Sequence, residues 1–229
     1  MLKNKTYLFL CIGLSIIFFM ITNIQFWIPD YLVKIRDAPY ETVVILFSVI
    51  CITAPVGGAI LSSSIGAKIG GYESPYALPI CISFSLLISI FGMPVPFLPN
   101  EYNWLFYLLL WFMIFCGGVI VPLCTGVMIS VVEPELRPQA SALANLLYNL
   151  LGYFPAPFVY GFICEHTGGA KSNWGMISTF IMAFPSMMFI CLAMYYKPDL
   201  RDYWVQKRKL MVAQYMSKHE KVPEKVIND

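Results

Sequence analysis

The polar side chains inside the long apolar stretches of this sequence are amides, hydroxyls and phenols, which form hydrogen bonds but carry no charge. Such groups are costly in hydrocarbon unless they meet a partner or water, so they mark either contacts between helices or a solvated path for a solute. A lone Thr has a further option, because its hydroxyl can bond its own backbone. The candidate pathway residues are Asn23, Gln25, Thr125, Asn145, Tyr148 and Asn149. These residues are therefore expected either to join neighbouring helices by hydrogen bonds or to face a solute pathway.

Catalysis is not predicted by the same stretches. An enzyme working within a membrane needs nucleophiles, paired carboxylates or metal ligands inside its helices, and both His166 and His219 lie outside the apolar stretches. All 7 cysteines lie singly inside them and form no Cys-x-x-Cys pair, a spacing that does not favour a metal site or a disulfide framework. We therefore expect no catalytic residue, no metal and no cofactor, and no motif indicates nucleic-acid binding.

The apolar stretches themselves are long enough to span a membrane. The chain is 59% hydrophobic and 12% charged, whereas soluble domains are about 45–50% apolar and about 25% charged. Windows without Asp, Glu, Lys, Arg or His, each near or above the roughly 20 residues that a spanning helix needs, cover approximately residues 7–29, 43–65, 77–98, 104–132, 139–164 and 174–196. We expect an all-α membrane protein with a six-helix domain over residues 1–197 and a basic cytoplasmic tail over 198–229.

Loop charge predicts the orientation of these helices, because Lys and Arg are retained on the cytoplasmic side. One face of the predicted topology carries Lys3, Lys5, Lys68, Arg137, Lys197, Arg201, Lys207, Arg208, Lys209, Lys218, Lys221 and Lys225. The other face carries Lys34, Arg36 and Lys171. Both termini are therefore expected in the cytoplasm, as an even number of crossings requires, and no address signal indicates an organelle.

Small residues recur at four-residue spacing in two of the windows. Ala54, Gly58, Ser62 and Gly66 form one stripe, and Gly118, Pro122 and Gly126 form another. Such stripes let helix backbones approach closely in lipid, and Pro122 removes a backbone hydrogen bond and favours a bend. Static packing and a gating movement are both consistent with these stripes.

The window over 139–164 has two predicted faces. The apolar face, expected to meet lipid, holds Leu143, Leu146, Leu147, Leu150, Leu151 and Phe154. The other face is expected to hold Ser141, Asn145, Tyr148, Asn149 and Gly152. Two Asn in one spanning helix indicate either hydrogen bonds to a neighbouring helix or a solvated cavity.

A family resemblance is carried by the loop and helix that read EPELRPQASALANLLYNLLGYFPAPFVYGFI, over residues 133–163. This segment resembles the one that joins the tenth and eleventh helices of major facilitator superfamily transporters. The features that match are Pro134, Arg137, the small residues from Ala140 to Ala144, Gly152, Pro157 and Gly161. The sequence FWIPDYL, over residues 26–32, is similar to the end of the seventh helix in Spinster-like members, which transport lysolipids, sphingoid phosphates and related amphiphiles.

The resemblance implies that the six helices correspond to the C-terminal half of the superfamily fold. One departure is SSSIGAKIGGY over residues 62–72, which keeps Gly66, Lys68 and Gly70 but has Ser63 and Ser64 where an Asp is expected. Alternating access needs two bundles that rock about a shared site. The implied partners are therefore a missing N-terminal half or a second six-helix bundle, together with membrane lipids and a small amphiphilic or lipid-like solute.

Two functions follow from this resemblance. The first is a transporter, or half of one, that moves the amphiphilic solute by alternating access. The alternative is a non-transporting six-helix protein that binds or regulates a full-length relative. The candidate gating residues are Lys68, Gly118, Pro122, Glu133, Glu135, Arg137, Gly152 and Pro157. For the charged members at 133–137, capping of the helix that follows is the alternative role, because carboxylates are favourable near a helix N-terminus.

Overall fold

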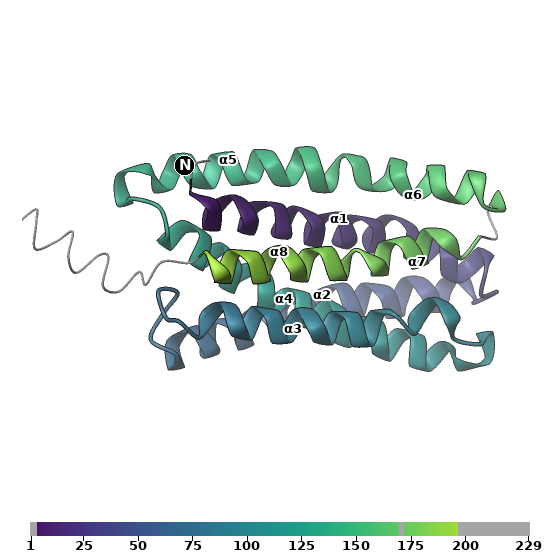
Figure 1. Ribbon diagram of the computed structural model, residues 1–229. Helices are drawn as coiled ribbons and strands as arrows, with labels where there is room; N and C mark the ends of the chain where they lie inside the picture. The colour runs from purple at the N-terminus through teal and green to yellow at the C-terminus, as the bar shows by residue number, and fades with distance from the viewer. Residues whose placement is uncertain (1–3, 170–171, 197–229) are drawn as a thin grey trace, which may run out of the picture. The chain divides into compact units, whose positions relative to one another are not determined.

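The computed structural model describes residues 4–169 and 172–196 and shows an all-helical bundle in that part of the chain (Figure 1). Its long helices are α1 (Lys5–Lys34), α2 (Tyr40–Lys68), α3 (Ala77–Gly92) and α4 (Asn103–Ser130). The fifth span combines α5 (Arg137–Leu147), the π-helix η4 (Tyr148–Tyr153) and α6 (Pro155–His166), and the sixth combines α7 (Trp174–Ile181) and α8 (Ala183–Tyr195). Short 3-10 turns η1 (Val95–Phe97), η2 (Asn100–Tyr102) and η3 (Pro134–Leu136) lie between them.

The predicted fold class is confirmed, because 6 helical segments in the described part of the chain are long and apolar enough to cross a membrane. The predicted tail over 198–229 lies outside the described residues. Helix α1 extends beyond the predicted window at its C-terminal end, where Asp30 and Lys34 form an ion pair of 2.8 Å one turn apart. The fifth window differs from a regular α-helix, because the π-helical turn inserts wider spacing at Tyr148–Tyr153.

The ends of the helices follow from local chemistry. The side chain of Asn4 caps α1 by accepting a hydrogen bond from the backbone N–H of Tyr7 at 3.3 Å, which satisfies a donor that the first helical turn leaves free. After α2 the chain turns through Gly70 and Gly71, with φ of 84° and 96°, in the left-handed region that glycine adopts without steric cost. We call the end of the bundle that holds these residues the Lys68 end and the opposite end the Arg36 end.

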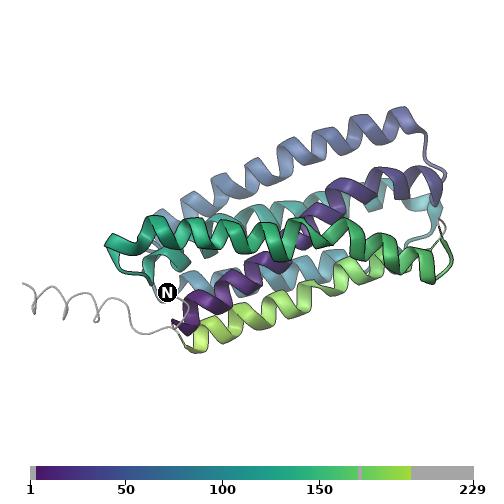
Figure 2. The ribbon, with the colours of Figure 1, turned by 90° about the horizontal axis from the view of Figure 1, so that it is seen from above.

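Helix α1 lies in the middle of the bundle and packs against α8, η4, α6 and α4. Figure 1 shows α5–α6 and α3 on opposite sides of α1 and α8, and Figure 2 shows α2 and α7–α8 at opposite edges. The most apolar window of α1 is 61% buried, whereas those of α2 and of the α5–α6 span are only 22% buried. Two of the spans therefore present most of their surface to whatever surrounds the bundle.

Helices α2 and α4 make the most extensive contact in the described bundle. The stripe of Ala54, Gly58, Ser62 and Gly66 is buried, and the expected close approach of helix backbones is confirmed at Gly58. A Cβ at Gly58 would clash with the backbone carbonyl of Phe115, and one at Gly118 would lie 2.7 Å from the carbonyl oxygen of Pro55. Without side chains at these two positions, dispersion contacts form between the helix backbones themselves.

At the Arg36 end, one buried guanidinium joins two loops. Arg36 is 2% exposed, and its three nitrogens donate to Asn103 Oδ1 at 2.8 Å and to the carbonyl oxygens of Leu98 at 2.8 Å and Pro99 at 2.7 Å. The guanidinium also lies 5.0 Å from the centre of the Phe106 ring, where a cation is attracted to the π face. Arg36 thereby connects the loop after α1 to the loop before α4.

The α2–α4 contact generates a prediction from two adjacent glycines. Gly58→Ala should lower the free energy of unfolding by roughly 1–3 kcal/mol, as overpacking does, because the obstructing atom is a backbone oxygen. Gly57→Ala is the matched control, since its Cβ would meet only the ring of Phe115 at 3.3 Å. Thermal unfolding of the purified protein measures both, and equal midpoints for the two variants would contradict the packing described.

Candidate functional site

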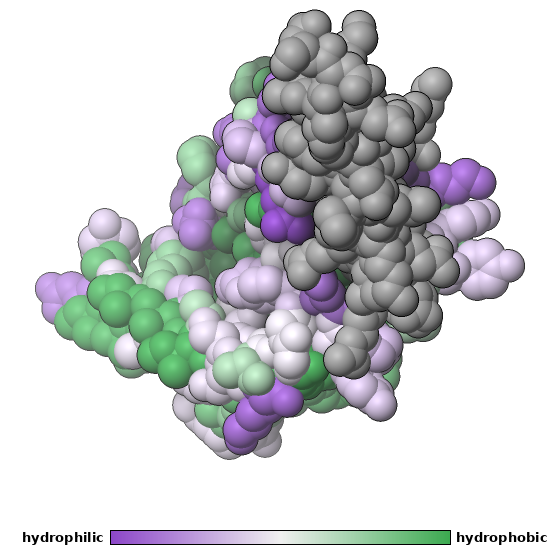
Figure 3. All heavy atoms as spheres, turned by 90° about the vertical axis from the view of Figure 1, so that its left-hand side faces the viewer, coloured by the Kyte–Doolittle hydropathy of each residue, from purple (hydrophilic) through white to green (hydrophobic). Residues whose placement is uncertain are grey.

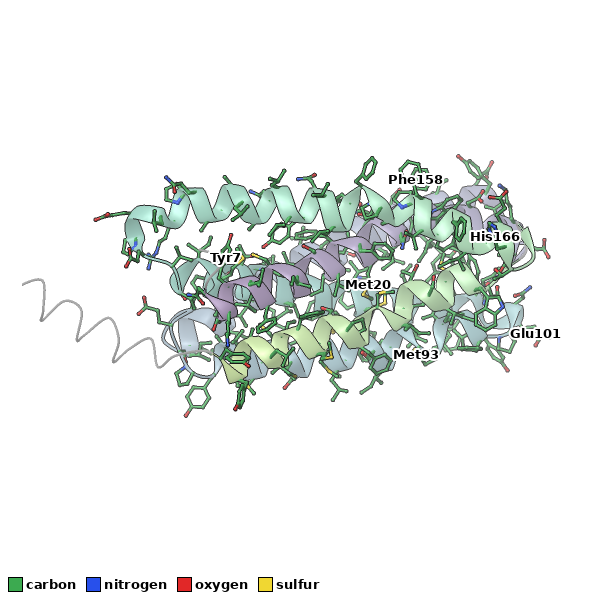
Figure 4. All side chains as sticks on the ribbon, turned by 45° about the horizontal axis from the view of Figure 1, so that its top comes forward. Tyr7, Met20, Met93, Glu101, Phe158 and His166 are labelled. Carbon is green, nitrogen blue, oxygen red and sulfur yellow. The ribbon has the colours of Figure 1, made fainter. Side chains whose placement is uncertain are left out.

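A cavity of about 290 Å³ lies halfway along the bundle, between α1, α2, α3, α4 and α8. Its volume is at the lower end of the roughly 300–1,000 Å³ found for small-molecule sites. Figure 4 places Met20, one of its lining residues, in the interior at the middle of α1. Most of the wall is apolar, with Ile17, Met20, Ile24, Ile88, Met113 and Val121 among its side chains.

Few polar groups reach this cavity. Ser186 lines it, but its hydroxyl donates to the carbonyl oxygen of Gly13 at 3.1 Å. Ser85 also lines it, and its buried Oγ has no hydrogen-bond partner within residues 4–169 and 172–196. Gln25 is exposed and stands in the wall on the side of α1. The arrangement can surround an apolar group and offer it a small number of hydrogen bonds.

Asn23 and Gln25, which the sequence groups together, have different surroundings in the structure. Asn23 is 1% exposed and is not among the residues lining the cavity. Among the described residues its Oδ1 has no hydrogen-bond partner, and neither has the indole Nε1 of Trp27 one turn later. Trp27 stacks on Tyr160 of α6 with ring centres 4.7 Å apart. Asn23 therefore lies in the packed wall of α1 and Gln25 at the cavity.

The predicted polar face of the fifth span is divided by the structure. Tyr148 is 5% exposed, packs on Phe18 of α1 with ring centres 4.7 Å apart, and donates to the Met128 sulfur at 3.3 Å. Asn145 and Asn149 are exposed, and the Asn149 amide donates to the carbonyl oxygen of Asn145 at 2.8 Å. The expectation that all three share one face is wrong, because adjacent positions such as 148 and 149 point about 100° apart on a helix, and the buried side of this span ends between them.

The predicted lipid face of the same span agrees in part with the structure. Leu146, Leu150, Leu151 and Phe154 are exposed, whereas Leu143 and Leu147 are half-buried. On the continuing helix α6, Phe158 projects outward from the bundle (Figure 4). Thr125 is half-buried on α4 and lies beside Tyr148. The exposed side of this span thus mixes large apolar groups with the two asparagines.

A second, more open cavity of about 400 Å³ lies at the Lys68 end. Figure 3 looks onto this end, where hydrophilic residues are interspersed and strongly apolar residues lie on the flank. Arg137 lines this cavity together with Gly70, Gly71 and Glu73 of the loop after α2. The Arg137 Nε donates to the carbonyl oxygen of Val132 at 3.4 Å. The structure thereby brings Arg137 to the same cavity as Glu73. The sequence analysis did not single out Glu73.

The other candidate gating residues lie at several depths of the bundle. Lys68, Glu133 and Glu135 are exposed. Gly118 is at the α2–α4 contact described above, and Pro122 lines the central cavity within an α4 that continues through it. A Cβ at Gly152 would lie 2.7 Å from the carbonyl oxygen of Ser15, so this glycine lets η4 approach α1. Pro157 is half-buried in α6. These positions are not brought together in one place.

Gly117 and Ser85 are among the residues of the central cavity that sequence reasoning missed. Gly117 lines it next to Gly118, and Ser85 lines it from α3. The adjacent glycines are a signal of close packing, but the sequence does not tell which of them meets a neighbouring helix. Among the described residues, no group of three or more His, Cys, Asp and Glu is placed to hold a metal ion.

Comparison with known proteins gives one family. The model of the Major Facilitator Superfamily matches residues 1–157, which include α1 to α4, α5, η4 and the start of α6. No curated protein matches the sequence.

Proposed function

Because the chain belongs to the major facilitator superfamily of membrane transporters, we propose that it forms half of a transporter that moves a small amphiphilic or lipid-like organic solute by alternating access. The central cavity is the observation that carries this proposal. An apolar wall with an amide at Gln25 suits a molecule with a hydrocarbon part and a polar part, since apolar burial supplies the affinity and the hydrogen bond supplies orientation. The Spinster-like assignment belongs to the same proposal and rests on FWIPDYL at residues 26–32.

A second six-helix bundle, either an N-terminal half or another copy, completes the transporter in this proposal. Its place is the surface of α2 and α5–α6, whose windows are the least buried of the six spans. Asn145 and Asn149 are exposed on this surface, and amides facing hydrocarbon are costly. A partner bundle that encloses water or solute against them removes this cost. The solute pathway then runs past Gln25 and the two asparagines, between the bundles.

The orientation in this proposal follows the charges. The Lys68 end carries Lys5, Lys68 and Arg137 and faces the cytoplasm, as the excess of basic residues in the flanking sequence favours. Both termini then share that side. At this end Arg137 acts as a gating residue, which pairs with Glu73 in one conformation and is separated from it in the other.

The transport proposal is tested by uptake of a single-chain lysophospholipid into cells that express the chain. We expect saturable uptake above that of cells with an empty vector, and Gln25→Leu should raise KM about tenfold, as loss of one hydrogen bond of roughly 1.4 kcal/mol does. Ser83→Ala is the control, because the Ser83 hydroxyl bonds the carbonyl oxygen of Pro79 on the exposed side of α3. Uptake of hydrophilic solutes alone would contradict the proposal.

The water-filled pathway is tested by the reactivity of introduced cysteines. Asn149→Cys should react with a membrane-impermeant methanethiosulfonate, because thiolates form in water. Leu150→Cys, at a position that is 60% exposed, should react at least about tenfold more slowly, because lipid raises the free energy of the charged thiolate. Mass spectrometry of the labelled peptide measures both rates. Equal reaction rates at the two positions would contradict a water-filled pathway along this face of the fifth span.

The gating role is tested by charge reversal. Arg137→Glu should lower the maximal uptake rate by about fivefold or more, the smallest effect expected of a conformational coupling of about 1 kcal/mol, whereas Arg137→Lys should retain most of it. Combining Arg137→Glu with Glu73→Arg should recover the rate, since the pair is restored with opposite polarity. A reversal that leaves uptake unchanged would reject gating by Arg137.

A further inference from the structure

The loop after α4 carries Arg137 but is held only weakly by it. The bond from Arg137 Nε to the carbonyl oxygen of Val132 is 3.4 Å long, which is longer than usual for a hydrogen bond of this kind. Pro134 and Pro138 restrict the backbone of the loop, so its course is set largely by whatever fixes its two ends. Both ends are bonded to the first turns of α1.

At the first end of the loop, the side chain of Asn4 has two roles. Its oxygen caps α1 by accepting from the N–H of Tyr7, and its amide nitrogen donates to the carbonyl oxygen of Val131 at 3.0 Å. Val131 is the C-cap of α4, where backbone carbonyls have no partner within the helix. One side chain therefore satisfies groups at the start of α1 and at the end of α4 together.

At the other end of the loop, Tyr7 bonds the first turn of α5. Its hydroxyl donates to the carbonyl oxygen of Ala140 at 2.7 Å, and both residues are buried. Figure 4 labels Tyr7 in the first turns of α1, on the side of α5. A buried tyrosine hydroxyl usually finds a hydrogen-bond partner, and this partner lies 133 residues later in the chain. We call the bonds from Asn4 to Val131 and from Tyr7 to Ala140 the α1 clamp.

The loop that carries Glu73 is held by different contacts. The ring of Tyr72 packs against α4 at Gly126, where an added Cβ would clash with it, and a Cβ on Gly66 of α2 would lie 3.9 Å from the same ring. The two glycines thus leave room for the ring between α2 and α4. Neither contact involves α1. Loss of the α1 clamp would therefore free Arg137 without freeing Glu73.

We propose that Asn4 and Tyr7 are positioning residues for Arg137. By holding both ends of the loop, the α1 clamp keeps the guanidinium at the cavity that it shares with Glu73, where the two charged groups can pair. This inference rests on the proposed gating role of Arg137 and adds the part of the chain that controls it. A displacement of the first turns of α1 reaches the gate through the two hydrogen bonds of the clamp.

Hydrogen exchange of the full chain in lipid nanodiscs tests the clamp without transport. Tyr7→Phe keeps the ring and removes the bond, so amides over residues 131–140 should exchange roughly fivefold faster, the equilibrium equivalent of one net hydrogen bond. Exchange over residues 70–76 should not change. Ser186→Ala is the matched control, because it removes another buried side-chain bond to α1, at the carbonyl oxygen of Gly13, and should leave the loop unaffected.

A variant of Asn4 separates its two roles in the same experiment. Asn4→Ser retains an oxygen that can cap α1 but lacks the amide that bonds Val131. It should raise exchange over residues 131–140 as Tyr7→Phe does, while exchange in the first turn of α1 stays as in the wild type. Loop exchange that equals the wild type in both variants, or that Ser186→Ala raises as much, would overturn the clamp.

Uptake of the single-chain lysophospholipid tests whether the clamp acts through Arg137. Tyr7→Phe should lower the maximal rate roughly fivefold with KM unchanged, because the contacts to the solute are retained. In an Arg137→Gln background, Tyr7→Phe should have no further effect, since changes that act through one group are not additive. A loss of packing alone would lower the rate by the same factor in both backgrounds, and that result would overturn the positioning role.

Exchange and uptake together separate the clamp from the gating role. Faster loop exchange in Tyr7→Phe, with uptake that is insensitive to Arg137→Glu, would support the clamp and contradict gating. Uptake that responds to Arg137→Glu, with loop exchange unchanged in Tyr7→Phe, would overturn the clamp and leave gating by Arg137 standing.

Discussion

The backbone contact between α2 and α4 is the interaction on which the rest of this bundle depends. Gly58 and Gly118 bring the two helices together at a distance that no side chain permits, in lipid where apolar side chains gain little by meeting each other. Helix α1 is held elsewhere, against α8 through Gly13 and against η4 through Gly152. Helix α2 packs along α4, whereas α1 packs along α8 and η4. Space remains between these two groups of helices, and the central cavity occupies it.

The polar groups are arranged around this packing according to what the membrane allows. At the Arg36 end, a buried guanidinium finds three oxygen acceptors and an aromatic face in loops where the backbone has carbonyls to offer. Within the spans, most hydroxyls bond the carbonyl one turn before them, as Ser15 and Thr22 do, since the helix itself is the only reliable partner in hydrocarbon. Side chains that depart from this pattern, such as Ser85 and Asn23, are therefore the informative ones.

The same arrangement relates the bundle to transport. The central cavity is enclosed by helices on several sides and has an apolar wall with an amide at Gln25. It can hold a solute by apolar contacts and a hydrogen bond, with no charge needed on the solute or on the cavity wall. The sparsely buried faces of α2 and α5–α6 are the surfaces on which another bundle would close the pathway.

The sequence alone establishes the class of fold, because the length and composition of an apolar stretch decide whether it can span lipid, and no other part of the chain needs to be known. It also determined the stripe of Ala54, Gly58, Ser62 and Gly66, since a regular helix places every fourth residue on one side. The tertiary structure was needed to show that Tyr148 is buried while Asn145 and Asn149 are exposed, because the position of the neighbouring helix α1 decides where along the circumference of this span the buried side ends. It alone distinguished Gly117 from Gly118, and Ser85 from Ser83. These neighbours have the same chemistry, and their roles differ because of the atoms that other helices bring to them.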